Sequence, residues 1–239
     1  MSTKSPDYKG RDKHDTVTTD VDHYSKIIKD PEIQEFLRLT DEHLGVIGFT
    51  EHGLRHATRV ANWAGMILHE LGFPKLDSEL AQIAGFLHDT ANFICRANHG
   101  QTGAALLYPI LRSHLEDAHQ LGLVLSAVGN HEEQYGQVFN NICAAVVIAD
   151  KADVHRSRVR NYDPSRGDIH DDVNYAVTES VLLVDRVARE VTLQLTVDTS
   201  IASVMDYFEI FLERMVMCRS ASAFLGCDFN IVCNGTLIS

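Results

Sequence analysis

Four residues of the types that bind divalent metal ions stand at the ends of apolar helical stretches. They are His56, the adjacent pair His88 and Asp89, and Asp150. A divalent cation that activates water takes neutral imidazole and carboxylate ligands from rigid elements, with at least one coordination position left open. Taken alone, a His-Asp pair is more often a buried histidine held by its neighbour. The set of four favours a metal site.

Three predicted helices must position these ligands. The first covers about residues 56–71 and opens with the first of these histidines. The second takes Asp77 or Ser78 as its N-cap and ends just before the His-Asp pair. The third covers about residues 142–160, and its apolar face continues into the last of the four ligands and Asp153. Three separate helices thus supply one cluster.

The remaining helical patterns define the larger part of the chain. Helices are predicted at about 103–111 and 121–128, and the first of them should be kinked or split at Pro109. Residues 21–165 are therefore expected to form a helical bundle. Residues 1–20 are polar and without periodicity, which predicts a flexible arm.

The periodicity changes in residues 166–239. Apolar and polar side chains alternate over 191–197, which predicts a half-buried strand with the segment NYAVTESVLLVD as its hairpin partner. A long helix capped by Asp198 or Thr199 should follow, and DFNIVCNGTLI should form a last strand. The predicted core or dimer surface of the long helix comprises Met205, Phe208, Leu212 and Met215. The fold class is therefore mainly α, with a small C-terminal α+β module of hairpin, long helix and strand.

Composition narrows the possible partners and the compartment. The net charge of -12 and the pI near 5.4 oppose binding to duplex nucleic acid. The five cysteines are an odd number without a CxxC pair, which favours reduced thiols and a cytoplasmic location. No apolar stretch is long enough for a membrane span, and the first residues do not resemble an export leader. We expect a folded protein whose main partner is not nucleic acid.

The four candidate ligands occur in motifs that resemble a known family. His56 in HATRVA, His88-Asp89 in GFLHDT and Asp150 in VVIADKAD resemble the H…HD…D signature of the HD superfamily of metal-dependent phosphohydrolases, over about residues 45–160. The resemblance implies a helical HD domain that hydrolyses a phosphate ester or anhydride, of a nucleotide or nucleotide derivative, with metal-activated water. Two alternatives remain open: a di-iron oxygenase of the same superfamily, and a non-catalytic nucleotide-sensing regulatory module.

Two further histidines, His99 in NHGQTGA and His131 in GNHEE, lie between the pair and the last aspartate. Two branches of the superfamily, the HD-GYP cyclic dinucleotide phosphodiesterases and the diadenosine tetraphosphate hydrolases, use extra histidines there to bind a second metal ion. The resemblance therefore implies one or two divalent ions (Mn, Fe, Mg, Ni or Co), with Asp89 bridging a pair. The alternatives are a helix cap for His99 and a surface position for His131. The GYP motif is absent, so neither branch's substrate is carried over.

Positive side chains near the ligands are the candidates for binding phosphate. Lys151 matches the lysine of the family's ADK motif, so the resemblance assigns it a catalytic role together with Asp89. Arg55, Arg59 and Arg96 join Lys151 as substrate-binding candidates, because a phosphate ester needs cations near its non-bridging oxygens. Ordinary surface or salt-bridge use is the alternative for the arginines.

Other features allow more than one interpretation. His52, one helical turn before the first ligand, is a possible extra metal contact, and Glu51, Glu132 and Glu133 are nearby acids. A homodimer through the apolar C-terminal module is a further hypothesis. A basic run either holds a polyphosphate tail or pairs with neighbouring aspartates, and it comprises Arg156, Arg158, Arg160 and Arg166.

Overall fold

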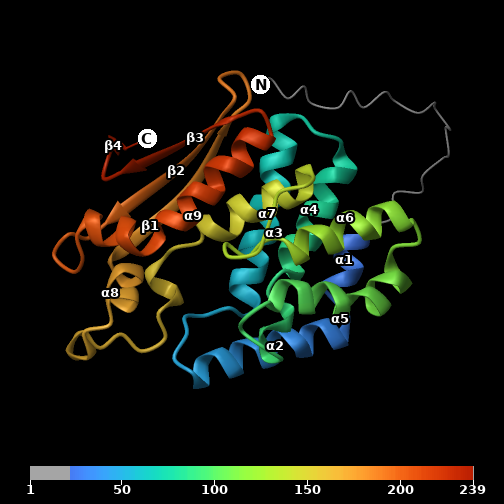
Figure 1. Cartoon of the computed structure of the whole chain (residues 1–239), viewed down its shortest axis with the longest axis horizontal. Coiled ribbons are helices and arrows are strands. Elements are labelled where there is room, and N and C mark those ends of the chain that lie inside the picture. The colour runs from blue at the N-terminus through green and yellow to red at the C-terminus, as the bar shows by residue number, and fades with distance from the viewer. Residues whose placement is uncertain (1–21, 239) are drawn as a thin grey trace.

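Helices make up most of the protein, and a four-stranded sheet forms its C-terminal end (Figure 1). The structure is a computed structural model that describes residues 22–238, so the predicted arm at 1–20 lies outside the described residues. The expected fold class, mainly α with a small C-terminal α+β module, is confirmed. Among residues 22–238, no helix has both the length and the apolar character needed to span a bilayer.

The helical part runs from α1 to α8. Its helices are α1 (His23–Ile27), α2 (Pro31–Val46), α3 (Leu54–Leu71), α4 (Lys75–Leu87), α5 (His99–His114), α6 (Ala118–Gly129), α7 (Asn141–Ala152) and α8 (Ile169–Ala176), with short 3-10 turns at Thr90–Phe93, Arg156–Arg158 and Pro164–Arg166. The C-terminal part comprises β1 (Val177–Asp185), β2 (Glu190–Val197), α9 (Val204–Phe224), β3 (Asp228–Cys233) and β4 (Thr236–Leu237).

The core lies where α3, α4 and α7 pack against one another. Every side chain of α7 from Ile142 to Ala149 is buried, which explains why this stretch is almost uninterruptedly apolar. Helix α3 ends at Gly72, whose φ of 82° is the left-handed C-cap conformation that glycine adopts without strain. These three helices position the four ligands predicted first, His56, His88, Asp89 and Asp150.

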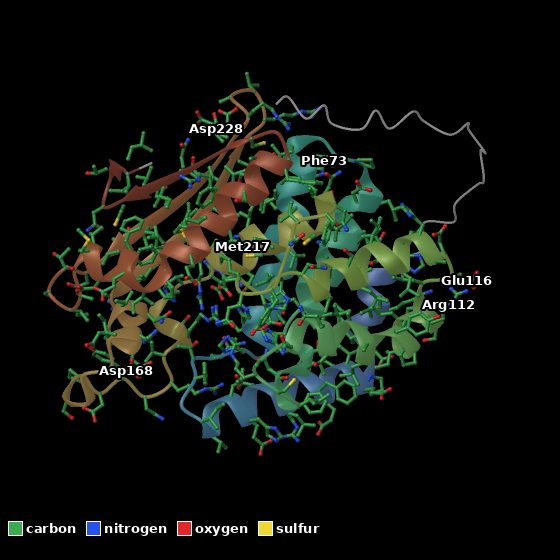
Figure 2. The ribbon with its side chains drawn as sticks, viewed as in Figure 1. Phe73, Arg112, Glu116, Asp168, Met217 and Asp228 are labelled. Carbon is green, nitrogen blue, oxygen red and sulfur yellow. The ribbon has the colours of Figure 1, made fainter. Side chains whose placement is uncertain are left out.

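The sheet has the strand order β1-β2-β3-β4. β1 and β2 form the predicted antiparallel hairpin, and β3 runs parallel to β2 because α9 crosses between them. Helix α9 also packs on α7, so the sheet module is attached to the helical core through it. In Figure 2, Asp168 before α8 and Glu116 after α5 mark opposite ends of the molecule. The central helices are therefore flanked by the sheet module on one side and by α5 and α6 on the other (Figure 1).

Three predicted helix boundaries in the first part are wrong. Helix α4 begins at Lys75 after Pro74, one turn before the expected cap. Helix α5 begins at His99 and continues through Pro109 without being split. Helix α7 ends at Ala152 instead of near residue 160, because Asp153 leaves the helical conformation (φ -80°, ψ 70°) and turns into a cluster of positive side chains.

The C-terminal part also differs from the prediction at three points. The first residues of the expected hairpin partner belong to α8, and β1 starts only at Val177. The expected last strand is two strands, since Asn234 and Gly235 both have positive φ and form a tight Asn-Gly turn between β3 and β4. Helix α9 starts after Ser203, which forms a capping box with Asp206.

The inward face of α9 is where the structure differs most from the prediction. Tyr207, Phe211 and Met215 are buried, whereas Met205 is 74% exposed and Leu212 is 56% exposed. Both faces of α9 carry apolar residues, so the periodicity alone did not identify the face that packs on α7 and the sheet. Of the predicted stripe, Met205 and Leu212 point away from the core.

Candidate metal centre

The four ligands predicted first form one compact cluster. His56 comes from α3, the pair His88-Asp89 follows α4, and Asp150 lies in the last turn of α7. The Nε2 atoms of His56 and His88 are 3.2 Å apart, and each lies 3.3 to 3.5 Å from Asp89 Oδ2 and Asp150 Oδ1. Ligand atoms held about 2.1 Å from one ion are spaced at about this distance from each other. The residues therefore fit a divalent metal ion.

Hydrogen bonds fix both imidazoles in the tautomer that a metal needs. His88 Nδ1 donates to the carbonyl oxygen of Gly85 at 2.8 Å, and His56 Nδ1 donates to Asp153 Oδ2 at 2.7 Å. With the proton on Nδ1, the lone pair of each Nε2 faces the cluster. Both rings are fully buried, so their orientation is set by packing as well.

A second cluster faces the other oxygen of Asp89. His99 Nε2 lies 3.0 Å from Asp89 Oδ1 and 2.9 Å from His131 Nε2, which is 3.7 Å from the same oxygen. Again each Nδ1 donates to a backbone carbonyl, of Arg96 for His99 and of Val128 for His131. Asp89 thus directs one oxygen to each pair of histidines.

The carboxylates of the cluster raise the pKa of two of its histidines. Burial lowers the pKa of His88, but the carboxylates of Asp89 and Asp150 outweigh it and raise that pKa to about 10. Burial also lowers the pKa of His99, and Asp89 and Glu132 raise it to about 9. Burial prevails at His131, whose pKa falls to about 4. Divalent cations bound there would neutralise the same carboxylates without protonating the imidazoles.

Asp153 is a buried carboxylate that supports the first cluster from behind His56. Besides accepting from the His56 ring, it forms ion pairs with Arg55 at 3.0 Å and with Arg59 at 3.3 Å. Arg59 also donates to the carbonyl oxygen of Ser180 and so links α3 to β1. The structure therefore gathers Arg55 and Arg59 around Asp153 and does not bring them into the cavities beside the ligands.

Lys151 lies directly beside the cluster, as its sequence position suggested. Its side chain is 5% exposed, and its Nζ is 2.7 Å from Asp150 Oδ2 and 3.1 Å from Glu133 Oε1. Burial lowers the pKa of Lys151, but the two carboxylates outweigh burial and raise it. Glu133 also pairs with Arg214 of α9 at 3.0 Å, which brings the C-terminal module to the site.

Two cavities open beside the ligands and share Arg96 and Arg214. One has a volume of about 350 Å³ and is also lined by Phe49, Arg158 and Phe211. The other has about 360 Å³, and its lining includes His99, Glu132, Glu133 and Gln134. A narrow space between Asp89, His131, Asp150 and Lys151 is also lined by Arg96 and Arg214, so it borders both cavities. Of these two cavities, the second reaches a clustered ligand, His99, and the first borders the narrow space through His52, Arg96, Arg158 and Arg214.

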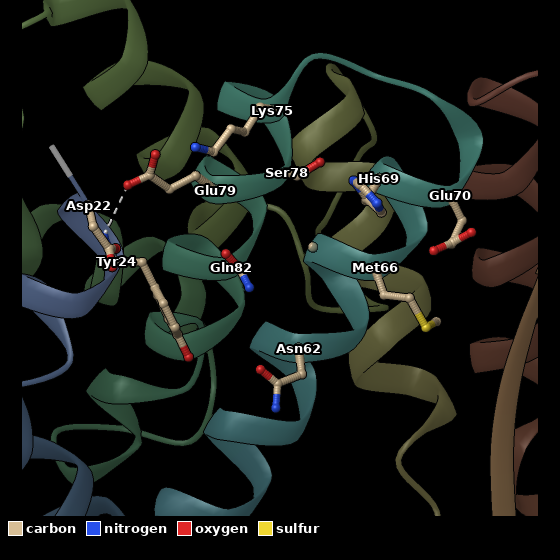
Figure 3. Close-up of a pocket in the computed structure, with 11 residues that line it drawn as sticks. Asp22, Tyr24, Asn62, Met66, His69, Glu70, Lys75, Ser78, Glu79 and Gln82 are labelled. Carbon is tan, nitrogen blue, oxygen red and sulfur yellow. Dashed lines mark hydrogen bonds between the residues drawn. The ribbon is translucent and has the colours of Figure 1, made fainter. Parts of the chain in front are cut away.

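A further cavity, of about 740 Å³, lies elsewhere. Figure 3 shows it between α3 and α4, lined by Tyr24, Met66, His69, Gln82 and neighbouring polar residues. None of the six clustered ligands lines it.

The other candidates from the sequence, His52 and the four arginines of the basic run, lie in different parts of the structure. His52 lines the narrow space, its ring centroid is 5.6 Å from that of His56, and its Nδ1 donates to the Thr50 carbonyl oxygen, but it belongs to neither group of converging ligand atoms. Of the basic run, Arg158 is 4% exposed and lines the cavity with the aromatic rings. Arg160 pairs with Asp41 instead. Arg156 lies over the Tyr175 ring. The side chain of Arg166 is not among those that the structure describes.

Sequence reasoning missed two residues that bear on the site. Asn92 donates from Nδ2 to Asp89 Oδ1 at 2.8 Å, and its own Oδ1 accepts from Arg96 at 3.0 Å. Its place three residues after the pair, in the turn that follows α4, was a usable signal. Arg214 had no such signal, because it lies on the face of α9 that the periodicity assigned wrongly.

Comparison with protein families gives a match to this chain. A search among curated proteins finds no match to the chain. The family model of the HD domain matches residues 53–209, a range that includes all six clustered ligands and Lys151. Because this match covers more than half of the sequence, the chain belongs to the HD domain family, a family of metal-dependent phosphohydrolases.

Proposed function

We propose that this protein hydrolyses a phosphate ester or anhydride bond of a nucleotide or nucleotide derivative at a two-ion centre. One observation carries the proposal: the two oxygens of Asp89 each face a separate pair of imidazole Nε2 atoms. When bound, divalent ions at such a centre polarise the phosphoryl group and lower the pKa of water toward neutrality.

The six ligands divide between two ions in this proposal. His56, His88 and Asp150 would hold the first, His99 and His131 would hold the second, and Asp89 would offer one oxygen to each. Four imidazole nitrogens favour a transition metal such as Mn, Fe, Co or Ni over Mg, which prefers oxygen ligands.

Cations beside the ligands would bind the phosphoryl oxygens. Lys151 keeps its charge through Asp150 and Glu133, and it lines the narrow space beside the ligands. Arg96 and Arg214 border both cavities, so they are placed to bind charge on either side of a phosphorus atom. Arg55 and Arg59 remain candidates from the sequence, and their contacts with Asp153 favour a role in positioning His56.

A nucleotide suits the cavity of about 350 Å³. Phe49, which is 40% exposed, supplies an aromatic ring on which a base can stack, and Arg158 adds a third guanidinium to those of Arg96 and Arg214. The same lining supports phosphate chemistry over the two alternatives. An oxygenase that acts on an uncharged substrate has no need of three arginines there. A purely sensing module has no need of six converging metal ligands.

The test is phosphate release from a panel of mono-, di- and dinucleotides, with the protein loaded separately with Mn, Mg and Fe. We expect turnover of one substrate class that is lost in the Asp89→Ala variant and kept in Asp228→Ala, a matched change at an exposed carboxylate on β3. Absence of turnover by fully metal-loaded protein across the panel would refute the hydrolase proposal. Oxygen consumption with iron-loaded protein would then test the oxygenase alternative.

A further inference from the structure

Helix α9 has an outward face that no other described part of the chain covers. Its inward face, with Tyr207, Phe211 and Cys218, packs on the core. Successive residues of an α-helix turn by about 100°, so residues spaced at three, four and seven positions share one face. The outward stripe, opposite the buried face, comprises Met205, Glu209, Leu212, Val216, Arg219 and Ala223, all exposed.

Apolar side chains dominate this stripe. Met205 is 74% exposed, Leu212 is 56% exposed and Val216 is 44% exposed. The solvent face of a surface helix normally carries polar and charged residues. Exposed apolar side chains gathered on that face are typical of an interface.

The two charges in the stripe are opposite in sign and symmetrically placed. Glu209 lies five residues before Arg214 and Arg219 lies five residues after it. Within residues 22–238 neither of the two forms an ion pair, although many other charged side chains do. A stripe with this pattern is complementary to a reversed copy of itself.

We propose that the protein forms a symmetric homodimer in which the outward stripes of two α9 helices pack antiparallel, with the two-fold axis beside residue 214. In this register Glu209 faces Arg219 of the partner subunit, and Leu212 faces Val216 of the partner subunit. Met205 likewise meets Ala223 of the partner subunit. A parallel pairing would bring each charge against its own copy, so the charges select the antiparallel arrangement.

The proposed interface leaves the metal centre accessible. Arg214, which lines both cavities, lies on the opposite face of α9 from Leu212 and Val216. The second copy therefore packs behind the helix that closes the site.

The test measures the mass of the metal-loaded full chain by sedimentation velocity over a range of micromolar concentrations. We expect a dimer for the wild type. Glu209→Arg and Arg219→Glu should each raise the dimer dissociation constant by about tenfold or more, because two like-charge contacts replace two ion pairs. The double variant Glu209→Arg/Arg219→Glu should restore the wild-type constant. Leu212→Lys should also dissociate the dimer, and the charge swap should not rescue it.

Glu116→Arg is the matched control, since Figure 2 places Glu116 far from Met217 of α9, and it should leave the dimer intact. All substituted side chains are exposed, so none of the substitutions should destabilise the fold of the chain itself. Thermal unfolding of the variants at a concentration where they are monomeric checks this. A wild type that is monomeric at every concentration would overturn the proposal. So would a double variant no more dimeric than the single ones.

Discussion

Replacing Asp153 with asparagine tests how the metal centre is supported without touching a ligand. The carboxylate is fully buried, and it accepts from His56 Nδ1 at 2.7 Å while pairing with Arg55 and Arg59. Burial raises the pKa of Asp153, but the hydrogen bond from His56 and the charge of Arg158 outweigh it and hold that pKa well below its usual range. The group is therefore a carboxylate at neutral pH, and Asp153→Asn removes its charge while keeping its shape.

Two effects of this substitution are expected, and they differ in size. Losing the carboxylate that orients a metal-binding histidine lowers metal affinity by about 10 to 100-fold, or about 1.4 to 2.8 kcal/mol. Removing one partner of a buried ion pair costs about 3 to 5 kcal/mol of folding free energy. Because Arg158, beside Asp153, is only 4% exposed, we expect the second effect to be the larger.

The assay combines competitive metal titration at room temperature with urea unfolding of metal-free protein. Asp228→Asn removes the same charge from an exposed position and should change neither quantity. If Asp153→Asn binds metal within a factor of two of the wild type, His56 is not held by Asp153 in the way described.

Further predictions concern other parts of the site and fold. Lys151→Met should lower kcat by about 100-fold while metal binding persists, as steady-state kinetics and metal titration will show. Gly100→Ala should destabilise the fold by about 1 to 3 kcal/mol and weaken the second metal site, because its Cβ would lie 2.8 Å from the Val128 carbonyl oxygen. Gly103→Ala, with its nearest contact at 3.3 Å, should cost less in the same unfolding assay. Asp30→Ala should cost about 1 kcal/mol at pH 7, because the carboxylate caps α2. Burial raises the pKa of Asp30, but its hydrogen bonds with His114 and the helix N–H groups lower it below 3.8, so this difference should shrink in urea unfolding as the pH falls below that value.

The sequence predicted the parts of the site that depend on local pattern. His56, His88 and Asp150 stand at the ends of apolar stripes, and those stripes are core helices that converge. His99 and His131 were predicted through a family resemblance, since nothing in their local pattern distinguishes a metal ligand from a helix cap. Only the folded chain shows that both face one oxygen of Asp89.

Other features depend on contacts between distant segments, which periodicity does not encode. The end of α7 at Ala152 follows from the ion pairs that Asp153 makes with residues of α3. The orientation of α9 follows from its packing on α7 and the sheet, because both of its faces are apolar enough to be buried. Arg214 was missed for that reason.

Metal stoichiometry is the most direct test of the central claim, that Asp89 joins two metal sites. Protein loaded with Mn and dialysed is analysed by mass spectrometry of its metal content, alongside the His131→Ala variant. The account predicts two ions per wild-type chain and one per variant chain. A single ion in the wild type, or the same content in both proteins, would contradict it.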